Sequence, residues 1–367
     1  MKPKIYALCV AMFCLSSCQN PSVAQVSTME VFPSSAPPVT QTYTGEESEN
    51  NQPKTVLLGY ALSWDGKTLA TYTNTGIYFY DLPTMRKSIF IEFDNSEYSE
   101  LRSGGIAFSP DNKQLAISGK FKDQPIAIWD IKTKKALTYF YNLPNGHYVT
   151  EIEFSPNGKT LAVRNTYPVS MRCESPEDKF TLIDLSKDII LFELDKCVIY
   201  PPIQFRLTYD DRIFLYFGSM SPDYSIYWVD SNSGNVISRE DLEWTDNEHL
   251  YDVSPDGKKY LVEDFSNEKR VTKILDSQSN ETLKTIEGKI LSFYKENGFV
   301  ISSYTSNPQW SFWEEDKSKC IYDGVENSPQ HKISQNGEIF VVMQSYTEYQ
   351  IWDIPTCSMI GQLQFDE

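Results

Sequence analysis

"IAFSPDNKQLAISGKFKDQPIAIWDIKTKKALTYF", residues 106–140, alternates short apolar runs with clusters of turn-forming residues. Ile106 and Phe108 stand two positions apart, which places both side chains on one face of a pleated strand. The Asp111–Asn112 pair supplies the positive φ that a tight hairpin needs. No apolar run is long or regular enough for a helix, so the stretch predicts four short strands joined by turns.

The same pattern recurs along the chain from residue 54 onwards. The second residue of the first turn marks seven copies, at Gly66, Asn112, Gly158, Asp211, Gly257, Gly298 and Gly337. A spacing of roughly 40 to 50 residues between copies is the signature of a repeat array. We therefore interpret each copy as one unit of four strands, here called a to d in chain order.

The third strand of each copy ends on an acidic residue. These residues are Asp81, Asp130, Asp184, Asp230, Asp276, Glu314 and Asp353. A carboxylate there can accept the amide hydrogens of the next turn, and Thr84, Thr133 or Ser233 would reinforce that turn. Such regularity indicates a structural role.

Four-stranded units that cannot bury both faces alone stack face to face, and seven of them close into a ring. We predict an all-β fold, a seven-bladed β-propeller of four-stranded antiparallel blades, over residues 54–367. We expect each blade to come from one continuous copy. The alternative is that residues 39–43, "VTQTY", complete the last blade.

The motifs "FSPDNKQLA" and "IAIWD" resemble the Trp-Asp (WD) repeat family, whose members are β-propellers. The resemblance is specific for the fold and poor for the function. Only Trp129–Asp130 and Trp352–Asp353 keep the dipeptide, and only Gly146–His147 keeps the family's Gly-His pair. The chain thus resembles a divergent, envelope-type propeller more than a cytoplasmic scaffold.

The N-terminus, "MKPKIYALCVAMFCLSSC", has two lysines, a short apolar run and small residues before a cysteine. The apolar run is shorter than the roughly 20 residues that a membrane span needs, so it predicts a secretory signal over residues 1–17. "LSSC" looks like the lipobox of bacterial lipoproteins, which implies lipid attachment at Cys18. Residues 18–53, rich in Ser, Thr, Pro and Asn, would form a flexible tether. We expect an extracytoplasmic protein held at a bacterial membrane by lipid, on the outer membrane or the outer face of the cell membrane.

Four cysteines lie in the repeats. Cys173 and Cys197 fall in one blade on the same rim, so in an oxidising compartment we expect them to form a disulfide. Cys320 and Cys357 are assigned to matching turns of neighbouring blades, which diverge at the outer edge. We expect those two to stay reduced.

The sequence offers little chemistry for catalysis. The three histidines, His147, His249 and His331, fall in or just before the first strand of a blade, where we expect structural roles. Residues 230–241 lack the glycine that a calcium loop requires. No linear catalytic or phosphate-binding motif occurs. We expect no catalytic residues, no metal and no cofactor, although carboxylate pairs drawn from separate blades leave no linear trace.

The net charge of −17 disfavours nucleic acid and anionic lipid headgroups as partners. The longer connections lie between strands b and c and between d and a, and long loops on a rigid frame are common recognition sites. Aromatic residues stand on or beside that face, at Tyr98, Tyr148, Tyr167, Tyr224, Trp244 and Trp310.

These residues predict a non-catalytic interaction module, a monomer that binds an envelope or extracellular protein. The alternatives are an enzyme, a lactonase or glycan-active propeller working in its channel, and a carbohydrate-binding propeller. The same loops are rich in acidic residues, among them Glu240, Asp241 and Glu243, and a merely solvated rim would explain that charge equally well.

Overall fold

The computed structural model describes residues 56–92, 104–121, 124–140, 148–166, 178–196, 204–217, 224–242, 247–266, 271–302, 309–314, 317–323, 331–345 and 348–364. These residues contain strands β1 to β28 and no helix. Accordingly, no helix in the described part is long and apolar enough to cross a membrane.

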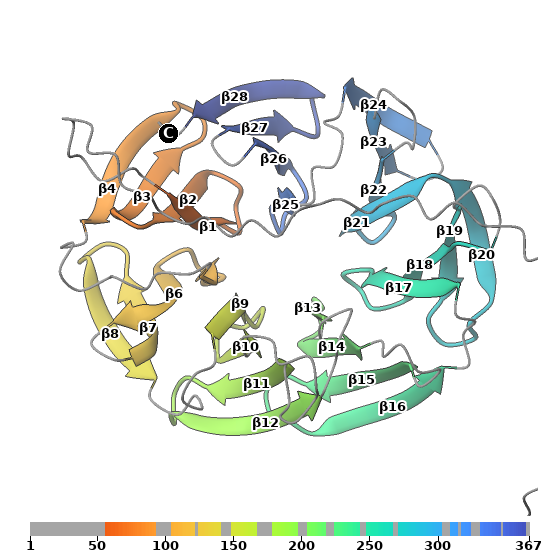
Figure 1. Ribbon diagram of the computed structural model, residues 1–367, viewed down its shortest axis with the longest axis horizontal. Coiled ribbons are helices and arrows are strands. Elements are labelled where there is room, and N and C mark those ends of the chain that lie inside the picture. The colour runs from red at the N-terminus through yellow and green to blue at the C-terminus, as the bar shows by residue number, and fades with distance from the viewer. Residues whose placement is uncertain are drawn as a thin grey trace, which may run out of the picture. The chain divides into compact units, whose positions relative to one another are not determined.

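The strands form seven antiparallel sheets, the blades of a β-propeller (Figure 1). The first strands of the blades are β1 (Leu57–Leu62), β5 (Ile106–Phe108), β9 (Tyr148–Phe154), β13 (Gln204–Leu207), β17 (Glu248–Val253), β21 (Lys289–Lys295) and β25 (His331–Ile333). The second strands are β2 (Thr68–Thr73), β6 (Gln114–Phe121), β10 (Thr160–Thr166), β14 (Arg212–Phe217), β18 (Lys259–Asp264), β22 (Gly298–Ser302) and β26 (Ile339–Ser345).

The third strands are β3 (Gly76–Asp81), β7 (Gln124–Asp130), β11 (Asp178–Asp184), β15 (Tyr224–Asp230), β19 (Val271–Asp276), β23 (Gln309–Glu314) and β27 (Glu348–Asp353). The fourth strands are β4 (Arg86–Glu92), β8 (Lys135–Phe140), β12 (Ile189–Lys196), β16 (Val236–Leu242), β20 (Thr282–Glu287), β24 (Lys317–Asp323) and β28 (Ser358–Gln364). Every sheet consists of four consecutive strands, which confirms the predicted fold and the origin of each blade in one continuous copy.

The turn between strands a and b is built by the same side chains in most blades. Six of the seven predicted marker residues have positive φ: Gly66, Asn112, Gly158, Asp211, Gly257 and Gly337. A buried hydroxyl precedes the a–b turn in six blades and tightens it, as where Ser109 Oγ donates to Asp111 and accepts from the Gln114 amide at 2.9 Å. The marker assignment is wrong for Gly298, which is the first residue of β22, because the turn of the sixth blade is formed one step earlier, at Glu296 and Asn297.

The turn between strands c and d follows the predicted acid. The carboxylate of Asp130 accepts the Thr133 amide at 2.6 Å, and Asp230 and Asp353 accept the corresponding amides of Ser233 and Thr356, both at 2.7 Å. The fourth residue after the acid has positive φ in six blades: Met85, Lys134, Asp188, Gly234, Asn280 and Cys357. The predicted structural role is therefore confirmed for six of the seven acids, Asp81, Asp130, Asp184, Asp230, Asp276 and Asp353, and not for Glu314.

The core lies mainly between neighbouring blades. Buried Ile and Leu side chains alternate along the strands, and each cluster joins residues of two adjacent sheets. The last and first blades meet in the same way, where Leu69 and Ile351 are buried and the rings of Tyr60 and Tyr349 lie 5.1 Å apart. The ring thus closes through side-chain packing.

Cys320 and Cys357 form a disulfide, with their Cα atoms 5.7 Å apart. The expectation that both stay reduced is wrong, because Cys320 lies within strand β24 and not in the turn before it. Position 357 is the positive-φ residue of the next blade's turn, which reaches back to the preceding blade. The equivalent turn position of the fourth blade also lies close to the blade before it. A Cβ added at Gly234 would lie 2.5 Å from the Leu191 carbonyl oxygen of the third blade.

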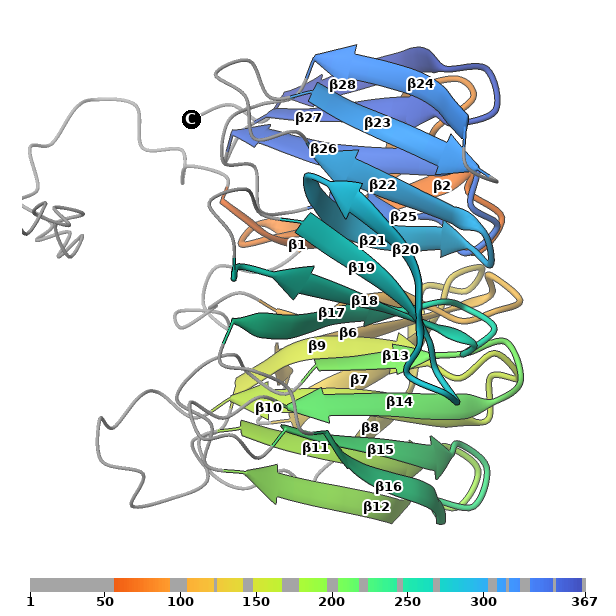
Figure 2. The same ribbon diagram turned by 90° about the vertical axis from the view of Figure 1, so that its right-hand side faces the viewer.

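The two ends of the ring differ in their connections. The a–b and c–d turns lie at one end, here called the turn face, where Figure 2 shows them at the right-hand side. The b–c and d–a connections join strand ends at the opposite end, here called the loop face. Most residues outside the described ranges belong to those connections.

Candidate functional site in the central channel

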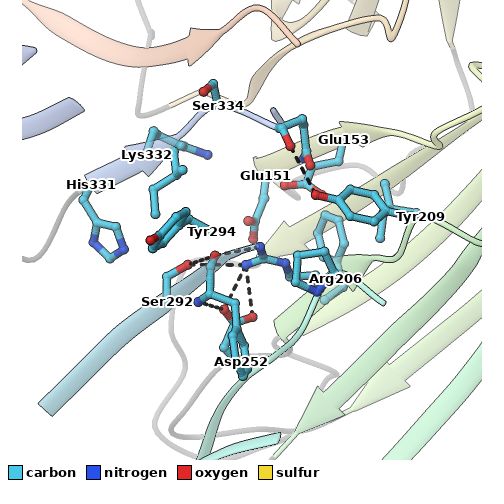
Figure 3. Close-up of a pocket in the computed structure, with 16 residues that line it drawn as sticks. Glu151, Glu153, Arg206, Tyr209, Asp252, Ser292, Tyr294, His331, Lys332 and Ser334 are labelled. Carbon is cyan, nitrogen blue, oxygen red and sulfur yellow. Dashed lines mark hydrogen bonds and ion pairs between the residues drawn. The ribbon is translucent and has the colours of Figure 1, made fainter. Parts of the chain in front are cut away.

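First strands from five blades, β9, β13, β17, β21 and β25, line a cavity of about 180 Å³ in the channel (Figure 3). Polar residues reach the channel from positions that alternate with core residues, because successive side chains of a strand point to opposite faces. On β9, for example, Glu151 and Glu153 alternate with buried Ile152 and Phe154. The polar lining residues are Glu151, Glu153, Arg206, Tyr209, Asp252, Ser292, His331, Lys332, Ser334 and Gln335.

Arg206 connects three blades from within the channel. Its Nη1 donates to both carboxylate oxygens of Asp252, at 3.1 and 2.9 Å, and its Nη2 donates to the Phe293 carbonyl at 3.1 Å. Asp252 also accepts the Phe293 amide at 3.0 Å. Burial raises the pKa of Asp252, while Arg206 and that amide oppose the rise. The group is satisfied within the protein and joins the fourth, fifth and sixth blades.

The two glutamates of β9 differ in their partners. Glu151 forms an ion pair with Arg164 of β10, with the Arg164 Nη1 3.0 Å from its Oε2. Among the described residues, Glu153 has no ion pair or side-chain hydrogen bond. The pKa of Glu153 is raised to about 7, first by burial and then by the neighbouring Glu151 charge, while Lys332 and Arg206 act in the opposite direction.

Tyr209 crosses the channel at the turn face. It belongs to the a–b turn of the fourth blade, and its hydroxyl donates to the Gln335 carbonyl of the seventh blade at 3.3 Å. Its backbone amide donates to the Pro255 carbonyl at 2.9 Å. These contacts place an aromatic ring across the end of the cavity.

The histidines contact aromatic rings in the part of the chain that is described. The His249 ring lies 5.3 Å from that of Phe265, and the His331 ring lies 6.1 Å from that of Trp310. His147 lies outside the described residues. Within the described ranges, no three His, Cys, Asp or Glu side chains are grouped so that they could hold a metal ion.

The structure brings few of the predicted site residues into view. Cys18, Tyr98, Tyr167, Trp244 and the pair Cys173 and Cys197 lie outside the described residues. Tyr148 and Tyr224 begin β9 and β15, without described side chains. Trp310 was predicted to stand on or beside the loop face, but it is only 3% exposed and its ring lies 5.1 Å from that of Phe340, so its side chain belongs to the core.

The polar cluster in the channel was not predicted from the sequence. A signal was present, because polar residues alternate with the apolar residues that identified strand a, as Arg206 does between Phe205 and Leu207. The apolar residues of that alternation predicted which side chains form the core, whereas the polar residues between them indicate which side chains face the channel.

Comparisons with known proteins support the fold. No protein-family model matches the sequence, and no curated protein sequence is similar to it. A chain of hydrazine synthase from Kuenenia stuttgartiensis is similar in structure, with a TM-score of 0.54 and 14% identity over 87% of this chain and 99% of that chain. A chain from the complex of KlAtg21 with the coiled coil of AgAtg16 gives a TM-score of 0.57 and 13% identity over 85% of this chain and 100% of that chain. At these identities the likeness defines a class, the seven-bladed β-propeller, and no particular member of it.

Proposed function

We propose that the chain is a lipid-anchored, extracytoplasmic binding module that presents its loop face to a protein of the cell envelope. The observation that carries this proposal is the difference between the two faces. The a–b turns of the turn face are short and hold their own hydrogen bonds, as where the hydroxyls of Ser63, Ser254 and Ser334 each accept a backbone amide of the same turn. The long connections, in which a partner could be recognised, belong to the loop face.

The cellular location draws on two further features. The Cys320–Cys357 disulfide is of a kind that persists in oxidising compartments. The N-terminal sequence resembles a lipoprotein signal that ends before Cys18. Membrane fractionation tests the anchor: Cys18→Ser is expected to release the protein from membranes or to leave it unprocessed. An unmodified Cys18 in the wild type would contradict it.

The binding face is tested by site-specific photo-crosslinking in intact envelopes. A crosslinker at position 244, between β16 and β17, is expected to capture a partner through its place beside the acidic residues Glu240 and Asp241. The matched control is position 113 on the turn face, where the Lys113 side chain is 77% exposed. Capture from position 113 and none from position 244 would assign the function to the wrong face.

The energetic contribution of the same site follows from interface physics. Trp244→Ala is expected to weaken binding by more than about 1 kcal/mol, since aromatic anchors supply most of the energy of an interface. Neutralising Glu240, Asp241 and Glu243 is expected to slow association with a basic partner and to flatten its salt dependence.

A further inference from the structure

Three carboxylates, Glu151, Glu153 and Asp252, and the cationic side chains of Arg206 and Lys332 line the cavity, and three of these five groups are paired. Glu151 is paired with Arg164, and Asp252 with Arg206, as described above. The remaining two are Glu153, from β9 in the third blade, and Lys332, from β25 in the seventh blade. Both line the same cavity.

Glu153 and Lys332 do not contact each other. Within the described residues, neither side chain forms an ion pair or a hydrogen bond, although the Lys332 charge acts on the carboxylate. Figure 3 shows the two side chains reaching the cavity from different strands. A carboxylate removed from bulk water without a partner is unfavourable, so a group that brings a cation to Glu153 would gain that interaction in full.

We propose that the channel binds a small zwitterion, a molecule with one ammonium and one carboxylate group. Its ammonium contacts the Glu153 carboxylate, and its carboxylate contacts the Lys332 ammonium. A simple cation would contact only Glu153, a simple anion would contact only Lys332, which is exposed to solvent, and an uncharged molecule would pair with neither charge. A zwitterion alone matches both without adding net charge to a site whose other charges are already paired.

The cavity has a size that suits such a ligand. Its volume of about 180 Å³ corresponds to roughly six water molecules at about 30 Å³ each, which an amino acid or a similar molecule could replace. The Tyr209 ring and its hydrogen bond to Gln335 lie across the turn-face end.

The test is isothermal titration calorimetry of the wild-type protein with three zwitterions of increasing length: glycine, β-alanine and 4-aminobutyrate. Acetate and methylamine, at the same ionic strength, represent the two halves of each molecule. At least one zwitterion is expected to bind ten times more tightly than either half. If all three bind no more tightly than acetate or methylamine, the proposal is wrong.

Variants then locate the site. Lys332→Met and Glu153→Gln each remove one charge at nearly constant size and are expected to weaken binding of the preferred zwitterion at least tenfold. Lys284→Met and Glu281→Gln are the matched controls on the outside of the fifth blade and are expected to leave binding unchanged. Unaltered affinity in both channel variants would overturn the assignment. If a channel variant does not give the wild-type circular dichroism spectrum, its affinity is disregarded. The wild-type affinities for the zwitterions, compared with those for acetate and methylamine, then decide whether the proposal holds. These titrations contain no partner protein. Their outcome therefore does not depend on the proposal that an envelope protein docks on the loop face.

Discussion

Burial raises the pKa of Glu153 to about 7, well above that of a glutamate in the unfolded chain. The folded protein therefore holds this proton more tightly than the unfolded chain does. Its contribution to stability is complete below about pH 4.5 and is lost as the pH rises through 7.

We expect Glu153→Gln to abolish this part of the pH dependence. Between pH 5 and pH 8 the wild type should lose about 1 to 3 kcal/mol of unfolding free energy relative to the variant, since a tenfold change in proton affinity corresponds to about 1.4 kcal/mol. Urea denaturation at the two pH values measures the difference. Glu281→Gln, at an exposed turn position, serves as the control and should parallel the wild type. If the unfolding free energies of Glu153→Gln and the wild type changed equally between pH 5 and pH 8, the Glu153 carboxylate would ionise normally in the channel.

Residues whose structural role is local could be predicted from the sequence. Asn112 and Asp211 have the positive φ that their turn motif indicates, and Asp130 binds the amide three residues ahead. The roles of Glu153 and Lys332 could not be predicted in this way. They depend on which strands line one cavity, and those strands belong to the third and seventh blades.

The c–d turn is the element that connects neighbouring blades at their outer edge. Its positive-φ residue lies against the fourth strand of the preceding blade: Gly234 lies against Leu191, and Cys357 is bonded to Cys320. Lys134 reaches the preceding blade through its side chain, which donates to the Ile89 carbonyl at 3.1 Å. One turn position therefore accommodates a glycine, a lysine or half of a disulfide.

Gly234→Ala tests this packing. A Cβ at position 234 would lie 2.5 Å from the Leu191 carbonyl oxygen in addition to straining a φ of 73°. The left-handed strain alone is worth about 1 to 2 kcal/mol, and the clash should bring the loss of unfolding free energy to about 3 kcal/mol. Asn280→Ala, at the same turn position with φ of 57°, is the control without that clash. Equal losses in urea denaturation would mean that the blades yield to the added methyl group.

The prediction that Cys320 and Cys357 stay reduced was wrong because of where one strand begins. The repeat pattern placed Cys320 in a turn, but β24 begins at Lys317 and carries the cysteine into the strand where the next blade's turn lies. Sequence spacing gave the number of blades correctly because it is set within each copy. It could not give the contact between two copies, which depends on how the sheets pack.

Across the whole ring, the Cys320–Cys357 disulfide fixes the seventh blade to the sixth, while the described residues of the seventh and first blades meet through packed side chains and through the hydrogen bond from the Asn336 side-chain amide to the Asp65 carbonyl. The two cysteines are 37 residues apart, and chain entropy for such a loop gives about 4 kcal/mol of stabilisation. The double variant Cys320→Ser, Cys357→Ser should lose about that amount in urea denaturation.

Peptide mapping without reductant should recover Cys320 linked to Cys357, and it tests the predicted Cys173–Cys197 bond in the same experiment. Reductant should destabilise the double variant only if that second bond exists. Two free thiols at 320 and 357 in the oxidised protein would contradict the assignment.

The consecutive strand order has a consequence for how the polypeptide could be rearranged. Since each sheet of the described residues is built from four consecutive strands, every hairpin survives if the backbone is opened between two blades. Opening it between β8 and β9 and linking Gln364 to Val56 would give a circular permutant with all seven sheets and the disulfide intact. The same seven-bladed ring can therefore form whichever blade is synthesised first.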